Sequence, residues 1–257
     1  MFAKKSYGQH FLRDTSAINT IVSATDPASV DLVVEAGPGL GALTDCLAPL
    51  AKRLVLIEAD RELIPGLEKK FSTAEIVQGD AAVVDYAVMA DDLRWVFVSN
   101  LPYNAASAII MAVLSCDKPP ERLVVMVQRE VGERMLAAPG DMSLLGVAIQ
   151  MYAQVKRVLL VKPGAFVPPP KVDSMVVQLT PKAYADAPNR EDIIGLAKIG
   201  FANRRKQLHR NLADAGYAAS DKVKQHLRDL GLSEQARAQE LSLEHWMTLW
   251  CKLKGAS

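Results

Sequence analysis

The sequence has almost no excess of charge of either sign. Its 30 lysines and arginines nearly balance 29 aspartates and glutamates, which leaves a formal net charge of +1 over 257 residues. This balance excludes a general electrostatic attraction to nucleic acid, so any basic surface must be local. No apolar run approaches the ~20 residues of a membrane span, and no apolar segment follows the lysines at the N-terminus. We expect a soluble, untargeted, cytoplasmic protein with no membrane contact.

Cysteine and histidine are also scarce. The three cysteines, Cys46, Cys116 and Cys251, lie far apart and form no CxxC motif. This spacing is typical of reduced, structural thiols and argues against disulfides or a zinc site. The four histidines share no metal-ligand spacing either. We therefore predict that the protein uses no metal.

Short apolar, β-branched runs alternate with helical stretches over residues 31–180. Strands that are apolar on both faces belong in a parallel sheet covered by helices on each side, which predicts a doubly wound α/β fold. The predicted strands are 32–36, 53–59, 75–78, 95–99 and 122–128, and the predicted crossover helices include 42–50, 61–71 and 105–114. Two further strands, 155–161 and 174–180, are joined by a Pro/Gly-rich loop and should pair antiparallel at one edge of the sheet.

The composition changes after residue 180. Residues 181–190 contain two prolines, small residues and mixed charge, which is typical of a linker. The rest of the chain has helical periodicity and almost no β-branched runs. The sequence thus predicts an α/β domain over residues 1–182 and a small all-helical C-terminal domain over residues 190–257.

A glycine-rich loop, "EAGPGLGA", follows the first predicted strand. Gly37, Gly39 and Gly41 would let a cofactor approach the backbone, with a helix N-terminus behind it. The loop also satisfies the G-x-G-x-x-A dinucleotide pattern, and a tight turn without a ligand is a further alternative. Glu58 ends the second strand and would hold a ribose diol with either nucleotide cofactor.

Asp80 follows the third strand, at the edge where ligands of open α/β sheets bind. Its carboxylate can accept a hydrogen bond from the exocyclic amine of an adenine, although taken alone it is as well explained as a helix N-cap. The glycine loop, Glu58 and Asp80 stand at the ends of successive strands. Together they indicate a pocket for an adenosine cofactor.

The fourth strand ends in "NLPY", residues 100–103. The side-chain carbonyl of Asn100 can accept a hydrogen bond from an amino group, and Pro102 fixes the turn so that the Leu101 carbonyl can do the same. Tyr103 offers a flat face to a base. An enzyme that alkylates the exocyclic nitrogen of a base needs this set, whereas a hydride-transfer enzyme does not. The competing interpretation is an ordinary Asn-Pro turn.

At this point the sequence resembles the ribosomal RNA adenine dimethyltransferase family, and in particular its members that act on the small subunit. The resemblance covers nearly the whole chain and is carried by "YGQHFLRD" (7–14), "VVEAGPGLGALT" (33–44), "NLPYN" (100–104) and "GAFVPPPKVDS" (164–174). It implies a Rossmann-like S-adenosylmethionine-dependent methyltransferase domain. It also implies dimethylation of the N6 amines of two adjacent adenosines near the 3′ end of 16S rRNA in the small ribosomal subunit, carried out by a monomer.

The resemblance further implies roles for single residues. His10 and Leu12 would touch the cofactor, Gly37 its methionine moiety, Glu58 its ribose and Asp80 its adenine, while Asn100 would be shared with the target amine. Leu101, Pro102 and Tyr103 would lie beside that amine, and Phe166 would stack on the other face of the target adenine. The family usually has asparagine where His10 stands. The segment 139–151 also departs from the family pattern, so no contacts are carried over to it.

A local basic cluster, Arg204, Arg205, Lys206 and Arg210, lies on a predicted helix and would contact RNA phosphates. Lys4 and Lys5 could add to it. The alternative is a solvated helix face.

Three rival functions remain open from the sequence. One is the related large-subunit rRNA methyltransferase of the macrolide-resistance type, and another is a ribosome-assembly or transcription factor that kept the fold without catalysis. The third, a nicotinamide dehydrogenase, explains the glycine loop but leaves "NLPY" unexplained.

Overall fold

A computed structural model describes residues 10–183, 187 and 189–255. The chain forms two compact units. Of the described residues, the first unit comprises those from His10 to Gly132 together with Gln154–Pro181, and the second comprises Glu133–Ala153 and the described residues from Lys182 onward. The sequence predicted one change of unit near residues 181–190, part of which lies outside the described residues. It did not predict that Glu133–Ala153 belongs with the helical unit. Among the described residues, no helix combines the length and apolar character needed to cross a bilayer.

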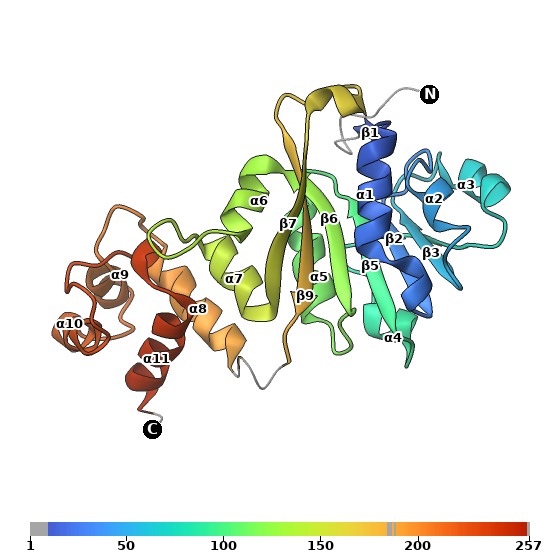
Figure 1. Cartoon of the computed structure of the whole chain (residues 1–257). Helices are drawn as coiled ribbons and strands as arrows, with labels where there is room; N and C mark the ends of the chain where they lie inside the picture. Colours follow the sequence, from blue (N-terminus) through green and yellow to red (C-terminus); the bar gives the residue numbers. More distant parts are fainter. Residues whose placement is uncertain (1–9, 184–186, 188, 256–257) are drawn as a thin grey trace. The chain divides into compact units, whose positions relative to one another are not determined.

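A seven-stranded sheet in the order β4-β3-β2-β5-β6-β9-β7 organises the first unit (Figure 1). Its strands are β2 (Leu32–Ala36), β3 (Leu54–Glu58), β4 (Glu75–Gln78), β5 (Trp95–Asn100), β6 (Arg122–Gln128), β7 (Ala153–Val161) and β9 (Ser174–Pro181). The pairs β4-β3, β3-β2, β2-β5 and β5-β6 are parallel, whereas β9 runs antiparallel to β6. The prediction of a mostly parallel sheet is confirmed, and the last two strands are neighbours at one edge, as expected.

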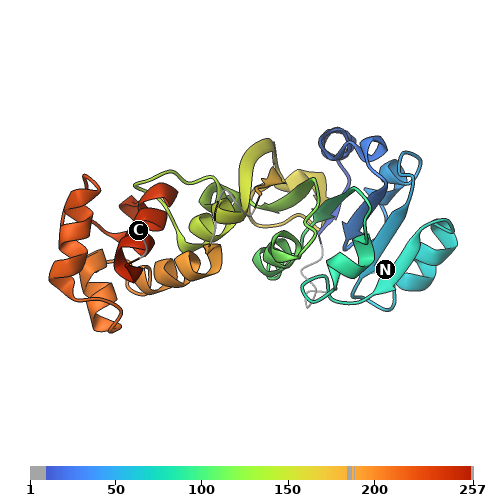
Figure 2. The same ribbon diagram turned by 90° about the horizontal axis from the view of Figure 1, so that it is seen from below.

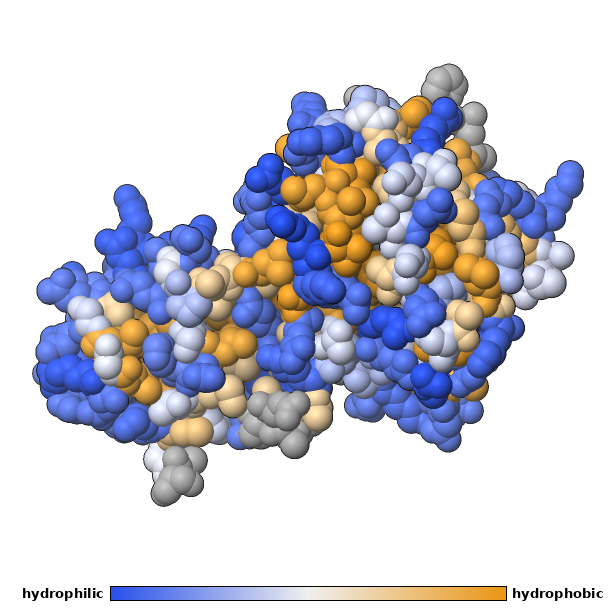
Figure 3. Space-filling model, in the orientation of Figure 1, coloured by the Kyte–Doolittle hydropathy of each residue, from blue (hydrophilic) through white to orange (hydrophobic). Residues whose placement is uncertain are grey.

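The central strands are buried on both faces because helices cover the sheet on either side. Every residue of β2 and β3 is buried. The helices of this unit are α1 (Thr15–Thr25), α2 (Thr44–Leu47), α3 (Ile64–Lys70), α4 (Tyr86–Ala90) and α5 (Ala106–Ser115). The boundary between the two units falls within α6 (Arg129–Met135). Figures 1 and 2 show α1 and α5 on opposite faces of the sheet. Figure 3 shows apolar side chains exposed on one face of this unit, bordered by hydrophilic ones.

The sequence did not predict α1, although its ends carry clear local signals. The Asp14 side chain accepts a hydrogen bond from the Ala17 amide at 2.9 Å, which caps the first turn. The helix ends at Asp26, whose left-handed backbone (φ +47°) cannot continue the helix. Ile18 and Ile21 turn inward and join the core beneath the sheet.

A two-stranded antiparallel ribbon closes one end of the unit. It joins β1 (Phe11–Leu12) to β8 (Phe166–Val167), with Phe11 opposite Val167 and Leu12 opposite Phe166. The Arg13 amide extends the ribbon by donating to the Ala165 carbonyl at 2.8 Å. The ribbon therefore ties the segment just before α1 to the Pro-rich loop that precedes β9.

The second unit is helical. It contains α7 (Leu144–Tyr152), α8 (Arg190–Gly200), α9 (Leu208–Asp214), α10 (Ser220–Asp229) and α11 (Leu243–Lys254). Short 3-10 helices lie at Pro27–Ser29, Pro163–Ala165 and Ala238–Glu240 along the chain. Helix α7 packs against α8: the Tyr152 hydroxyl donates to Glu191 at 2.8 Å, and the Arg190 guanidinium lies 4.8 Å from the Tyr152 ring centroid. These contacts explain why residues before β7 belong to this unit.

Candidate active site

A cavity of about 540 Å³ opens over the carboxyl ends of β2, β3 and β5. Ligands of open α/β sheets bind at this edge, and the volume suits a small-molecule ligand. All the residues that the sequence proposed for the cofactor line it: His10, Leu12, Gly37, Glu58, Asp80 and Asn100. Leu101, Pro102 and Tyr103 line it as well. Residues from four strand ends and from the N-terminal segment thus meet at one cavity.

The glycine loop has the backbone that its sequence predicts. Gly37, Gly39 and Gly41 have φ values of +66°, +59° and +80°, in the left-handed region that favours glycine. At Gly41 a Cβ would lie 2.6 Å from the Phe71 ring, so glycine is required there by packing. At Gly37 a Cβ would meet no atom within 4 Å and would extend into open space, although this residue lines the cavity. The absent side chain of Gly37 therefore leaves room for a ligand against the backbone.

Glu58 lines the cavity from the end of β3 and is 5% exposed. Its two oxygens accept hydrogen bonds from the backbone amides of Gly39, at 3.2 Å, and Asp60, at 2.9 Å. Burial raises the pKa of this carboxyl group, and the two amide donors act against that rise. Because a carboxylate oxygen has two acceptor positions, Glu58 can still accept a hydrogen bond from a diol.

Glu35, one residue before the end of β2, also lines the cavity, and the sequence analysis missed it. Its side chain is buried, and its Oε2 accepts a hydrogen bond from the Thr44 hydroxyl at 2.7 Å. Burial raises the pKa of Glu35 to about 8, and the nearby Glu58 charge adds to the rise. The sequence did carry a signal for this residue, because Glu35 is the single carboxylate in the otherwise apolar run "LVVEA".

Asp80 makes a capping contact, one of the two alternatives that its sequence context left open, and it also lines the cavity. It lines the cavity just beyond β4, and its Oδ1 accepts a hydrogen bond from the Ala82 amide at 2.9 Å. The side chain therefore stabilises its own turn, as a capping residue would. It is exposed, and it keeps acceptor capacity for an amine in the cavity.

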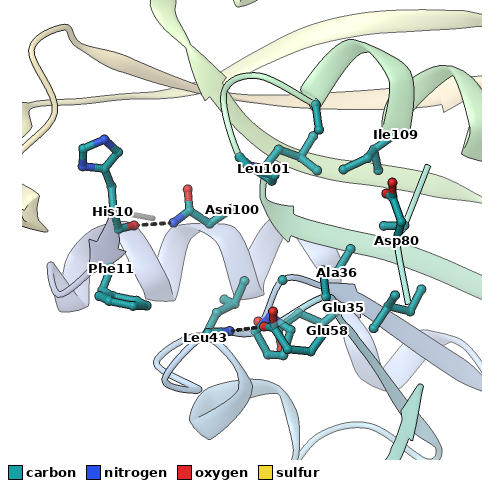
Figure 4. A pocket seen from close by; sticks show the side chains of 18 of the residues that line it. His10, Phe11, Glu35, Ala36, Leu43, Glu58, Asp80, Asn100, Leu101 and Ile109 are labelled. Atoms are coloured by element: carbon teal, nitrogen blue, oxygen red, sulfur yellow. Dashed lines mark hydrogen bonds between the residues drawn. The ribbon is translucent and has the colours of Figure 1, made fainter. Parts of the chain in front are cut away.

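Asn100 is held by its amide nitrogen. Its Nδ2 donates to the His10 backbone carbonyl at 2.9 Å, and Figure 4 shows the side-chain oxygen pointing away from that carbonyl. Within the described residues, no hydrogen bond engages this oxygen. The Leu101 amide next to it donates to the Met126 carbonyl at 3.1 Å, which fixes the loop against β6. The amide orientation leaves the carbonyl oxygen of Asn100 as the acceptor, as the sequence predicted for recognition of an amino group.

Tyr103 is fixed from two sides. Its hydroxyl lies 2.8 Å from the Ser174 hydroxyl, at the start of β9. Its ring stacks on the His10 imidazole, with centroids 5.5 Å apart and planes 29° apart. Burial raises the pKa of the Tyr103 phenol, so the ring stays neutral at physiological pH. Ser174 was missed because only the folded chain brings "KVDS" to "NLPY".

Phe166 does not lie where the resemblance implied. It is 2% exposed and belongs to the hydrophobic core with residues of α1 and the sheet, such as Ile18 and Met126. It is also absent from the cavity lining. The ring therefore lies in the core in this structure, and the expectation that it stacks on a target base stays a prediction. Its pairing with Leu12 in the small ribbon directs the ring into the core.

The basic cluster of the second unit is exposed, but it does not lie on one helix. Arg204, Arg205 and Lys206 occupy turns between α8 and α9, and only Arg210 is helical. The Asn211 side chain donates to the carbonyls of Gly200, at 2.6 Å, and Asn203, at 3.0 Å, which stabilises the non-helical connection. The predicted helix face is therefore wrong. The Lys206 ammonium pairs with Asp214 at 2.8 Å.

The other cations of the cluster, Arg204, Arg205 and Arg210, are exposed and have no ion pair within the described residues. The predicted contribution of Lys4 and Lys5 lies outside the described residues.

Fold and site together define a class: a Rossmann-like S-adenosylmethionine-dependent methyltransferase with an added helical unit. The model of the family described as ribosomal RNA adenine dimethylase matches residues 2–254. The chain belongs to this family. S-adenosylmethionine is accordingly its cofactor, and the room beside Gly37 and the acceptors Glu58 and Asp80 fit such a molecule.

Individual relatives cover almost the whole chain. The ribosomal RNA small subunit methyltransferase A of Syntrophotalea carbinolica is 40% identical over 95% of this chain and 94% of its own length. A dimethyladenosine transferase from Plasmodium falciparum has a similar structure, with a TM-score of 0.82, 28% identity, and coverage of 96% of this chain and 98% of that one. The 23S rRNA methyltransferase ErmE follows with a TM-score of 0.75, 25% identity, and coverage of 95% and 99%.

Proposed function

We propose that the protein transfers methyl groups from S-adenosylmethionine to the N6 amines of two adjacent adenosines near the 3′ end of 16S rRNA in the small ribosomal subunit. The observation that carries this proposal is the orientation of Asn100. Its nitrogen is held by the His10 carbonyl, so its oxygen faces an incoming amine as an acceptor. The products would be N6,N6-dimethyladenosines.

Sequence similarity supports the small subunit as the substrate. The relative named for the small subunit is 40% identical to this chain, whereas the structurally similar enzyme named for 23S rRNA is 25% identical. Both cover nearly the whole chain, so the difference does not arise from a shared fragment. These values favour the small-subunit enzyme over the large-subunit alternative.

The chemistry asks for positioning more than for acid-base groups. The cofactor supplies an electrophilic methyl group bound to a sulfonium sulfur. The neutral thioether that departs when the methyl group is transferred is a good leaving group. Asn100 Oδ1 and the Leu101 carbonyl would accept the two amine hydrogens, and Pro102 restricts the turn that presents them. Tyr103 would stack on the flipped-out base and fix its approach. We propose direct in-line transfer without a covalent enzyme intermediate or a metal, with the proton leaving after transfer.

The cofactor side of the cavity would be divided among the strand ends. Gly37 would lie against the methionine moiety, Glu58 would bind the ribose hydroxyls, and Asp80 would accept from the adenine amine. Leu12, which is 4% exposed, would provide apolar contact beside them. The open Cβ position at Gly37 and the remaining acceptor positions on both carboxylates support this division.

RNA binding would involve the helical unit. We propose that Arg204, Arg205, Lys206 and Arg210 contact phosphates, which their exposure supports. Lys206 would exchange its Asp214 partner for a phosphate. We also propose that the protein works as a monomer, because one unit of a single chain supplies the cavity lining. We propose the cytoplasm as the place where it works.

The decisive experiment compares transfer of labelled methyl groups to undermethylated small subunits and to large-subunit RNA, followed by location of the product. We expect label in two adjacent adenosines of small-subunit RNA. Label only in large-subunit RNA would support the macrolide-resistance alternative. If the protein binds small subunits but transfers no label to either RNA, it is a non-catalytic assembly factor and our proposal is wrong.

A further inference from the structure

His10 makes three contacts around the amine-recognition loop. Its imidazole stacks on the Tyr103 ring, with centroids 5.5 Å apart, and its Nδ1 lies 2.8 Å from the Pro168 carbonyl oxygen. Its own backbone carbonyl accepts the hydrogen bond from Asn100 Nδ2. One residue therefore contacts both polar elements of "NLPY" and the Pro-rich loop, three segments that are distant in sequence.

The direction of the side chain separates His10 from the cofactor groups. Figure 4 shows the imidazole pointing away from Glu58, while its backbone carbonyl faces Asn100. A ring turned toward Tyr103 and Pro168 has its flat face and its Nδ1 already engaged. The contact with the cofactor that the family resemblance implied for His10 is therefore at most a backbone or edge contact.

The His10 backbone is itself fixed by its neighbours. Phe11 and Leu12 pair with β8, and the Arg13 amide donates to the Ala165 carbonyl at 2.8 Å. A carbonyl at the end of a hydrogen-bonded ribbon cannot rotate freely, so it holds the amide of Asn100 in one orientation. The same ribbon delivers the imidazole to one face of Tyr103.

We propose that His10 is a positioning residue for the methyl transfer: its ring braces Tyr103 from one face, and its carbonyl sets the amide of Asn100. This inference rests on the proposed function and deepens it. A braced Tyr103 presents only its other face to the target base, and a fixed Asn100 presents only its oxygen to the amine. Preorganisation of this kind acts on turnover more than on cofactor affinity, because both contacts orient groups that would receive the target base, the Tyr103 ring and the Asn100 amide.

The test compares His10→Ala, which removes the ring, with His10→Phe, which keeps a flat ring but not the nitrogen. The backbone carbonyl remains in both variants. Ser16→Ala, an exposed side chain six residues further on in α1, is the matched control. Each protein is assayed for kcat and KM on undermethylated small subunits, for the Kd of S-adenosylmethionine by calorimetry, and for the midpoint of thermal unfolding.

We expect His10→Ala to lower kcat by about 10-fold to 100-fold while the cofactor Kd changes by less than about threefold. His10→Phe should recover most of the lost turnover because stacking on Tyr103 is restored. Ser16→Ala should match the wild type.

Three results would overturn the inference. The first is a His10→Ala variant with wild-type kcat at saturating cofactor and a cofactor Kd raised about tenfold, since His10 would then be a cofactor ligand. The second is a His10→Phe variant as slow as His10→Ala, and the third is a loss of kcat that follows a fall in unfolding midpoint. In each case wild-type transfer to small subunits leaves the proposed function intact, whereas absence of wild-type transfer overturns both.

Discussion

Glu35 should make the stability of the sheet unit depend on pH through the neutral range. Its carboxyl group is buried beside the cavity with Thr44 as a hydrogen-bond donor, and burial raises its pKa from 4.5 to about 8. A raised pKa in the folded state means that the folded protein binds the proton more tightly than the unfolded chain. The contribution of protonated Glu35 to the free energy of unfolding is fully present below about pH 4.5 and is lost as the pH rises through about 8.

The size of the effect follows from the two pKa values. They differ by about 3.5, and one pKa unit corresponds to about 1.4 kcal/mol, so the full loss is on the order of 5 kcal/mol. About 3 kcal/mol of this is already lost at pH 7, where the unfolded carboxyl is ionised and the folded one is still protonated. This is a large share of the stability of an ordinary domain.

Glu35→Gln tests this reasoning because glutamine is nearly isosteric and keeps an acceptor for the Thr44 hydroxyl. Both proteins would carry Trp246→Phe and Trp250→Phe, so that Trp95, buried in β5, is the remaining tryptophan and reports on the sheet unit. Urea unfolding followed by fluorescence at pH 5, 6, 7 and 8 gives the free energy of unfolding of each protein.

The free energy of unfolding of Glu35→Gln minus that of its parent should rise by about 3 kcal/mol from pH 5 to 8. The other titrating groups are the same in both proteins, so their contributions cancel in this difference. Glu68→Gln, at an exposed position of α3, is the control and should run parallel to the parent. If the Glu35→Gln and parent curves are also parallel over this range, the buried carboxyl does not hold its proton and the reasoning is refuted.

Three further predictions concern binding and transfer. Gly37→Ala should raise the calorimetric Kd of S-adenosylmethionine at least about tenfold, because the added Cβ enters the cavity. The control is Gly216→Ala, which has a similar φ of +68° but lies away from the cavity. Both variants should lose ~1 kcal/mol of stability from the left-handed backbone, and only Gly37→Ala should lose cofactor affinity. Asn100→Ala should abolish methyl transfer yet leave subunit binding largely intact, and wild-type turnover would refute its role. Arg204→Gln combined with Arg205→Gln should reduce the slope of log K against log salt for RNA binding by about 1.5, and an unchanged slope would rule out phosphate contacts there.

Local sequence patterns were sufficient for the sheet and for most of the cavity. A strand buried on both faces shows as a continuous apolar run, so β2 and β6 were predicted to the residue. The bounds of β4, a partly exposed strand at the edge of the sheet, were also predicted correctly. A turn that needs a positive φ can also be predicted from the sequence, because few residues other than glycine adopt that backbone and glycine therefore stands there. Groups at the ends of parallel strands converge on one edge by geometry, which is why Glu58 and Asp80 could be brought to one site before the fold was known.

The basic turn shows where such patterns fail, and Phe166 shows where the family resemblance and this structure differ. Residues 203–206 carry helix-compatible side chains, but Asn211 binds the carbonyls of Gly200 and Asn203 and thereby stabilises a non-helical turn. Phe166 has the same local sequence whether its ring enters the core or faces a ligand. Its pairing with Leu12, 154 residues earlier, decides between the two.

The amino-acid sequence sufficed for the order of the strands along the chain, the glycine loop and the identity of the groups proposed to face an amine, because each depends on residues near in sequence. The orientation of those groups depends on contacts between distant segments. The Asn100 amide is held by the His10 carbonyl, the Tyr103 hydroxyl lies against Ser174, and His10 Nδ1 lies against the Pro168 carbonyl. Such hydrogen bonds form only when the ribbon and the sheet bring these segments within about 3 Å, and no local pattern encodes that approach.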